Sequence, residues 1–196
     1  MNESGIASNG RSGAGLAPRP VWMVLIVAGG ACLSPFFACV TPFAAVATVA
    51  ALKLGGRDAF ASVGLVWLAN QVIGYGFLAY PVTWDSGAWG VAIGASSGLA
   101  VIVAKGLSSA DRVPLAISLP FVGSFAAFEL GLYLAGVVLP VSDAAFRASV
   151  IGNVFLVNAA ALCGLLAVYS SAAGLGIVGR RDAAADLLAL SGAAFR

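Results

Sequence analysis

The sequence predicts an all-α fold, a polytopic transmembrane bundle of five to six membrane-spanning helices. Hydrophobic residues make up 61% of the chain and charged residues 9%, against roughly 45–50% and about 25% in soluble domains. The charged residues lie between long apolar runs, and Glu129 is the exception that lies deep inside one. Both observations indicate a chain that is embedded in a lipid bilayer.

Composition also argues against several classes of function. The net charge of +2 is small and scattered, so nucleic acid is not an expected partner. The chain has no histidine, the commonest metal ligand and the usual general base near neutral pH. The cysteines number three and lie in apolar segments, where a free thiol behaves as a small hydrophobe. No catalytic motif is present, and we therefore expect neither an enzyme nor a cofactor or metal site.

The chain divides into a disordered tail at residues 1–20, a helical bundle at 21–179 and a short cytoplasmic tail at 180–196. The first apolar stretch, residues 21–52, would measure roughly 48 Å as one helix, whereas the hydrocarbon core is about 30 Å thick. Gly29, Gly30, Pro35 and Pro42 interrupt it. It therefore crosses the membrane once as a kinked helix or twice as two short ones, and a signal peptide over its first part is a rival interpretation.

Four further spans have lengths close to the 20 or so apolar residues that cross a bilayer. They are expected at Ala59–Tyr80, Ala88–Ala104, Leu115–Leu139 and Val150–Tyr169. Basic residues concentrate on the connectors and terminus of one side, namely Lys53, Arg57, Lys105, Arg112, Arg180, Arg181 and Arg196. Such loops face the cytoplasm, so we expect an integral protein of a bacterial inner membrane with a cytoplasmic C-terminus.

Small residues recur every four positions in three places. The stripes are Gly90, Gly94 and Gly98, then Gly123, Ala127, Gly131 and Ala135, and finally the pair Ala47 and Ala51. Small residues at this spacing let helix backbones approach closely in lipid. The stripes pack helices of this chain together or dock a partner membrane subunit.

Glu129 is the strongest candidate for a functional residue. A charged group near the centre of the bilayer costs about 2.5–3.5 kcal/mol on insertion scales and is by default a functional-site hypothesis. Helical spacing places Phe125 and Tyr133 on the same face. Since no predicted span carries a Lys or Arg, a neutral Glu129 either binds a ligand or joins helices by a hydrogen bond.

Two further groups of polar and aromatic residues are candidates. Trp67, Asn70 and Gln71 share one broad helical face, which suits a pocket with an apolar wall and a few polar groups, although amides also commonly bridge membrane helices. Trp84 lies in a connector rich in Trp, Tyr and Asp. That connector is either a lid over an outward pocket or part of an interfacial aromatic belt.

The small size, the span number, the cytoplasmic C-terminus and the segment PFAAVATVAAL resemble the substrate-binding components of energy-coupling-factor vitamin transporters. The resemblance implies that Ala47 and Ala51 dock a shared transmembrane subunit. It implies a vitamin-like small-molecule ligand captured from outside by the Trp84 loop, Asn70, Gln71 and Glu129, with ATP hydrolysed by partner subunits. The competing hypothesis is a structural or assembly subunit of a larger membrane complex.

Overall fold

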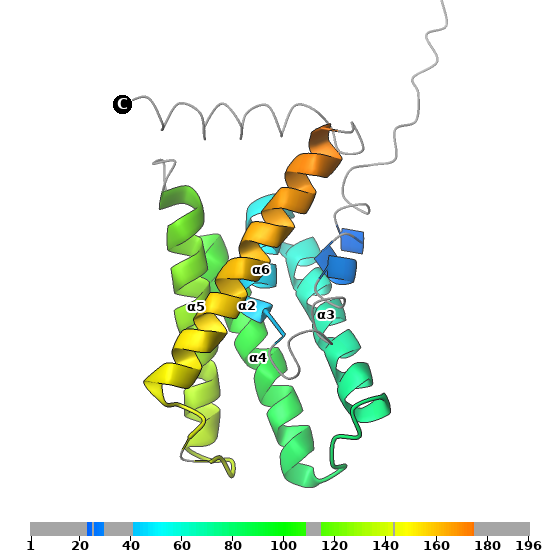
Figure 1. Cartoon of the computed structure of the whole chain (residues 1–196), viewed down its shortest axis with the longest axis vertical. Helices are drawn as coiled ribbons and strands as arrows, with labels where there is room; N and C mark the ends of the chain where they lie inside the picture. The colour runs from blue at the N-terminus through cyan, green and yellow to red at the C-terminus, as the bar shows by residue number, and fades with distance from the viewer. Residues whose placement is uncertain (1–22, 25, 30–40, 109–114, 143, 175–196) are drawn as a thin grey trace, which may run out of the picture.

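The computed structural model describes residues 23–24, 26–29, 41–108, 115–142 and 144–174. All regular structure in these ranges is helical, comprising residues 23–24 and 26–29 followed by α2 (Phe43–Lys53), α3 (Gly56–Gly76), α4 (Trp84–Leu107), α5 (Leu115–Gly136) and α6 (Ala148–Gly174). The last four are long and apolar enough to cross a membrane, and consecutive ones run in opposite directions (Figure 1). The predicted all-helical membrane fold is confirmed.

The predicted five to six spans are not confirmed, because the described residues hold four helices of sufficient length. These four correspond to the predicted spans after Leu52. α2 has 11 residues and is about 16 Å long at 1.5 Å per residue, half of a bilayer core. Whether residues 21–52 cross once or twice depends on residues 30–40, which lie outside the described residues, as do the predicted tails at 1–20 and 180–196.

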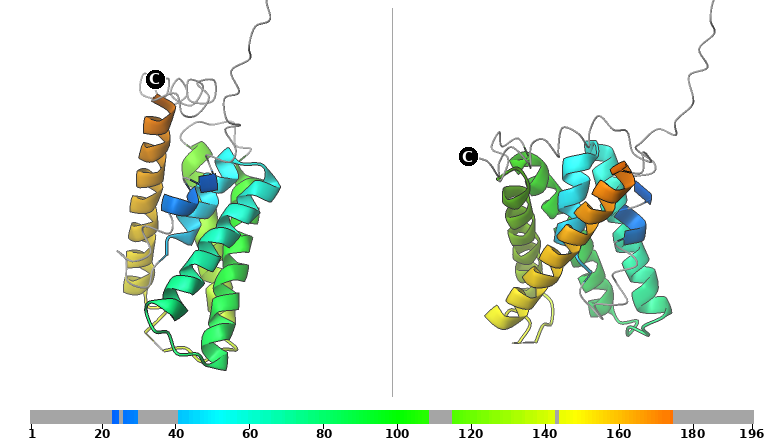
Figure 2. Two further views of the ribbon diagram at one scale, coloured as in Figure 1. Left: turned by 90° about the vertical axis from the view of Figure 1, so that its right-hand side faces the viewer. Right: turned by 45° about the horizontal axis from the view of Figure 1, so that its top comes forward.

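The short helix α2 forms the interior of the bundle. Nine consecutive residues, Phe43 to Ala51, are all buried, as expected for a helix that is apolar on every side. α2 lies among the longer helices in the half of the bundle where α3 begins (Figures 1 and 2). Its Ala and Val side chains are small, which allows α3, α4, α5 and α6 to pack around one central helix.

Polar contacts from all four long helices hold α2 in place. Near its start, Thr41 Oγ1 donates to Asn70 Oδ1 of α3 (2.5 Å), and Ser124 Oγ of α5 donates to the Ala44 carbonyl (3.1 Å). The backbone N–H of Ala45 donates to Asn158 Oδ1 of α6 (3.2 Å). Backbone groups at a helix end need such partners where water is excluded.

The other end of α2 is capped by a lysine. Lys105 Nζ of α4 donates to the carbonyls of Ala51 (2.9 Å) and Leu54 (2.5 Å). A cation is favourable there because the last carbonyls of a helix carry partial negative charge. Lys53 and Arg57 lie at this same end of the bundle, whereas Arg147 lies at the opposite end, just before α6.

The glycine stripes pack helices of this chain against one another. A Cβ placed on Gly94 would lie 3.0 Å from the Trp67 ring, and one on Gly98 would lie 3.8 Å from Phe60, so this stripe faces α3. On α5, Gly131 faces Ser96 of α4, where an added Cβ would lie 3.3 Å from the Ser96 Cα. Intramolecular packing therefore accounts for these two stripes.

Candidate functional site

A cavity of about 330 Å³ lies beside the start of α2, on the side away from Lys105. Its walls come from α2, α3, α4, α5, α6 and the loop between α5 and α6. The lining residues are Thr41, Phe43, Asn70, Trp89, Ile93, Phe128, Glu129, Leu132, Val141, Ala145, Phe146 and Val154. The volume is within the range of small-molecule sites, about 300–1,000 Å³.

Two of the predicted residues, Glu129 and Asn70, share this cavity. Glu129 is half-buried, and no hydrogen bond or ion pair joins its carboxyl to the part of the chain that the structure describes. Asn70 Oδ1 accepts the bond from the Thr41 hydroxyl. The cavity therefore combines one carboxyl group and an oriented amide with walls that are otherwise apolar, which is the usual composition of a small-molecule site.

Aromatic rings make up much of the cavity wall. Phe43 of α2 and Phe128 of α5 are 5.8 Å apart between ring centroids and tilted by 33°. The Trp89 indole N–H donates to the Pro140 carbonyl (2.9 Å), which ties α4 to the loop after α5. Phe146 packs edge to face against Tyr133 at 5.5 Å. Contacts with neighbouring residues therefore hold all four lining rings.

The start of α2 also faces the cavity, since Thr41 and Phe43 line it. The first N–H groups of a helix attract anions when they are unpaired. Here the N–H of Phe43 donates to the Thr41 carbonyl (2.8 Å) and that of Val46 to the Pro42 carbonyl (3.1 Å). Ala45 donates to Asn158. Most of the donors at this helix end are therefore already engaged within the protein.

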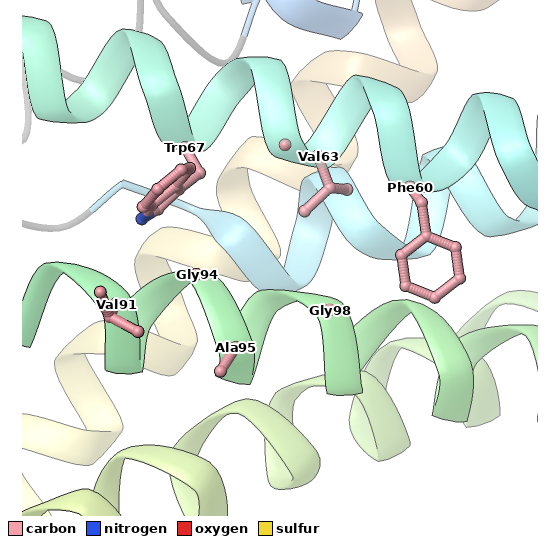
Figure 3. A pocket seen from close by; sticks show the side chains of 8 residues that line it. Phe60, Val63, Trp67, Val91, Gly94, Ala95 and Gly98 are labelled. Atoms are coloured by element: carbon pink, nitrogen blue, oxygen red, sulfur yellow. The ribbon is translucent and has the colours of Figure 1, made fainter.

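Trp67 and Gln71 lie outside this cavity and face α4. Trp67 Nε1 donates to the Gly90 carbonyl (2.8 Å), and Gln71 Nε2 is 3.5 Å from the same oxygen. A second cavity of about 350 Å³ lies between α3 and α4, where the side chains of Trp67 and Phe60 on α3 face Gly94 and Gly98 on α4 (Figure 3). α3 thus presents Asn70 to one neighbour and Trp67 with Gln71 to another.

The remaining candidate residues do not line the Glu129 cavity. Tyr133 is 55% exposed and contacts the lining residue Phe146, and Trp84 is 72% exposed at the start of α4. Ala47 and Ala51 are 0% and 3% exposed, so α2 is enclosed by helices of its own chain. A partner subunit would reach these two alanines only if the bundle opened.

The residues of the cavity lining that sequence reasoning missed include Thr41, Trp89, Phe128 and Phe146. Trp89 lies near the end of a predicted span, where an aromatic ring is typical of the membrane interface, and Phe128 is the immediate neighbour of Glu129 in the sequence. Of the two asparagines of α6, Asn158 is fully buried and bonded to α2, whereas Asn153 is exposed. The two residues are five apart in the sequence and therefore about 140° apart around the helix, so they meet different surroundings.

The cavity lies in the half of the bundle opposite Lys53, Arg57 and Lys105. Trp89 is in the second turn of α4, and Val141, Ala145 and Phe146 belong to the loop between α5 and α6.

Comparison of the chain with protein-family models, with curated proteins and with solved structures gives no match. The resemblance to energy-coupling-factor components stays a prediction, and function has to be argued from the geometry of the cavity.

Proposed function

We propose that this membrane protein binds a small organic, vitamin-like solute as a component of a transporter. The observation that carries the proposal is the Glu129 cavity, which the Glu129 carboxyl group and the Asn70 amide line together with several aromatic rings. A membrane helix loses stability by carrying a carboxyl group that has no partner. A ligand that interacts with Glu129 gives this residue a role.

The position of the cavity supports capture of the solute from outside the cell. Loops rich in Lys and Arg face the cytoplasm, and the cavity lies in the half of the bundle away from Lys53, Arg57 and Lys105. We therefore place the α5–α6 loop at the outer face and the C-terminus inside, in a bacterial inner membrane. A short helix ending within the membrane beside a cavity is also a recurrent feature of transporter sites.

The alternative proposal is a structural subunit without a ligand of its own. One observation favours it, the apolar cavity between α3 and α4 that Phe60 and Trp67 overhang (Figure 3). Val91, at its rim, is 65% exposed, so the cavity opens on the surface that faces lipid. A lipid chain or a neighbouring helix would fill such a groove without any solute.

Ligand-induced stabilisation of the purified full chain separates the two proposals. Thermal unfolding is measured in detergent with a library of water-soluble metabolites, because a ligand that binds the folded state raises the melting temperature. Glu129→Gln and Asn70→Ala should abolish the shift. Asp58→Asn, a carboxyl-to-amide change at the opposite end of the bundle, should retain it. A library that stabilises nothing, or that stabilises the cavity variants equally, would overturn the solute proposal.

A further inference from the structure

We infer that the solute of the Glu129 cavity is an organic cation, a compound that carries a protonated amine or a quaternary ammonium group. The inference rests on the proposed function, since it names the chemical class of ligand for the same cavity. It follows from three properties of the lining, namely its charge, its hydrogen-bonding groups and its aromatic rings. Each of them has to be compared with what an anionic or neutral ligand would need.

The charge of the lining favours a cation. Among the described residues that line the cavity, Glu129 is the one acidic or basic residue, so the described lining offers no Lys or Arg to neutralise an anion. Arg147 follows the lining residue Phe146, but its side chain is exposed and is not part of the wall. A bound cation would supply the counter-charge that the described residues do not offer to Glu129, whereas an anion would add a second negative charge.

The hydrogen-bonding groups point the same way. The Thr41 hydroxyl already donates to Asn70, and the Trp89 indole N–H already donates to the Pro140 carbonyl. The Glu129 oxygens act as acceptors when the group is ionised, and an ammonium group brings donors and no acceptor. An anionic ligand would instead need donors, and the Thr41 hydroxyl and the Trp89 indole N–H are used within the protein, which leaves the Asn70 amide nitrogen as the side-chain donor of the described lining to be considered.

The aromatic rings provide the third property. Phe43, Trp89, Phe128 and Phe146 come from α2, α4, α5 and the loop before α6 and line one cavity. Faces of aromatic rings attract cations, and rings grouped around a pocket are the common means of holding quaternary ammonium groups. Neutral apolar ligands would also pack against these rings, but they would leave the Glu129 carboxyl without a partner among the described residues.

Within the described part of the cavity, the start of α2 is a feature that opposes a cation. A helix N-terminus is equivalent to about half a positive charge, and its effect fades within the first turn. Glu129 is expected to be neutral without a counter-charge, but a bound cation favours its ionised form, which carries a full negative charge in the same lining. The N–H groups of Phe43, Ala45 and Val46 are already paired. The net field therefore favours a cation.

The cavity of about 330 Å³ holds roughly eleven groups the size of a water molecule, which suits a compound with one ring.

The test uses four compounds built on one benzyl or phenyl ring, so that charge is the main variable. Benzylamine and benzyltrimethylammonium are cations, benzyl alcohol is neutral and benzoate is an anion. Their affinities for the purified full chain are measured by calorimetric titration in detergent. We expect the two cations to bind at least about tenfold more tightly than benzyl alcohol, with no binding of benzoate.

Variants with matched controls link any binding to this cavity. Glu129→Gln and Trp89→Leu should each weaken binding of the cations by about tenfold or more. Asp58→Asn and Trp84→Leu should leave it unchanged, since neither residue lines the cavity. A variant that fails to fold is recognised by circular dichroism. Trp89→Phe is then used in place of Trp89→Leu, because it keeps an aromatic ring in the cavity and removes only the larger indole with its N–H.

The outcomes separate this inference from the proposed function. Benzyl alcohol or benzoate binding as tightly as the cations would overturn the cationic assignment and leave a solute-binding cavity. Cation binding that survives Glu129→Gln unchanged would also overturn it. No binding by any of the four compounds refutes the inference, while the metabolite library decides independently whether the cavity accepts another solute.

Discussion

Replacement of Asn158 tests how α2 is anchored in the centre of the bundle. Asn158 is fully buried, its Oδ1 accepts from the Ala45 N–H at 3.2 Å, and its Nδ2 donates to the Val154 carbonyl at 2.9 Å. Asn158→Leu keeps a side chain of similar size and removes the acceptor. The Ala45 N–H then has no described partner inside a bundle from which lipid excludes water.

The expected loss is worked out from that orphaned donor. A buried unsatisfied group costs about 1–3 kcal/mol, and loss of a helix N-cap costs roughly 0.5–2 kcal/mol. Hydrogen bonds between membrane helices average about 0.6 kcal/mol and reach about 1.7. Because the bond lies at a helix end, where no intrahelical partner exists, we expect a loss of about 1–3 kcal/mol in the free energy of unfolding.

Thermal unfolding in detergent measures this loss. On the scale of soluble domains of this size, about 2–4 °C per kcal/mol, Asn158→Leu should lower the melting temperature by roughly 2–12 °C. Asn153→Leu, on the same helix but exposed, provides the matched control and should change it by less than about 2 °C. Hydrogen exchange at the Ala45 amide should accelerate in the Asn158 variant alone. Equal melting temperatures for the two variants, with unchanged exchange at Ala45, would refute the anchoring role of Asn158.

Two further predictions concern the helices that surround α2. Lys105→Met removes both bonds to the carbonyls at the end of α2 and should lower the free energy of unfolding by about 1–3 kcal/mol, measured by thermal unfolding. Arg57→Met, at an exposed position of the same end, should lower it by less than about 0.5 kcal/mol. Equal effects of the two changes would contradict the capping role of Lys105. Gly131→Ala should destabilise by roughly 1–3 kcal/mol because the new methyl group meets Ser96 of α4. A Cβ added at Gly152 would have no neighbouring atom within 4 Å, so Gly152→Ala should instead stabilise the protein by up to about 1 kcal/mol through helix propensity. If Gly131→Ala also stabilised the protein, α4 and α5 would not pack as closely as the structure shows.

The lengths of the apolar runs were sufficient to locate the four long helices. The expected span Leu115–Leu139 compares with α5 at Leu115–Gly136, and Ala88–Ala104 compares with α4 at Trp84–Leu107. Hydropathy could not show that the first apolar stretch contains a short helix enclosed by the others. A segment buried in protein and a segment buried in lipid are equally apolar, and the covering of α2 depends on contacts with residues far along the chain, such as Asn158 and Lys105.

The candidate site was predicted in part for a similar reason. Glu129 was singled out because a carboxyl group within an apolar run is costly wherever it lies. Asn70 was grouped with Trp67 and Gln71, yet at 100° per residue Gln71 is about 40° from Trp67 and Asn70 is about 60° away on the other side. The side chains of Asn70 and Gln71 therefore point about 100° apart around α3, which is enough for them to contact different segments. Asn70 contacts Thr41, whereas Trp67 and Gln71 contact Gly90 of α4. Which neighbour each residue meets depends on the packing of the helices.

The most direct test of the account is native mass spectrometry of the full chain released from the membranes of cells grown in rich medium. The central claim is that the Glu129 cavity holds a small organic solute. It predicts that the wild-type protein retains a small molecule that Glu129→Gln and Asn70→Ala lose and Asp58→Asn keeps. A wild-type protein without any bound small molecule, or one whose bound molecule stays equally in the cavity variants, would contradict it.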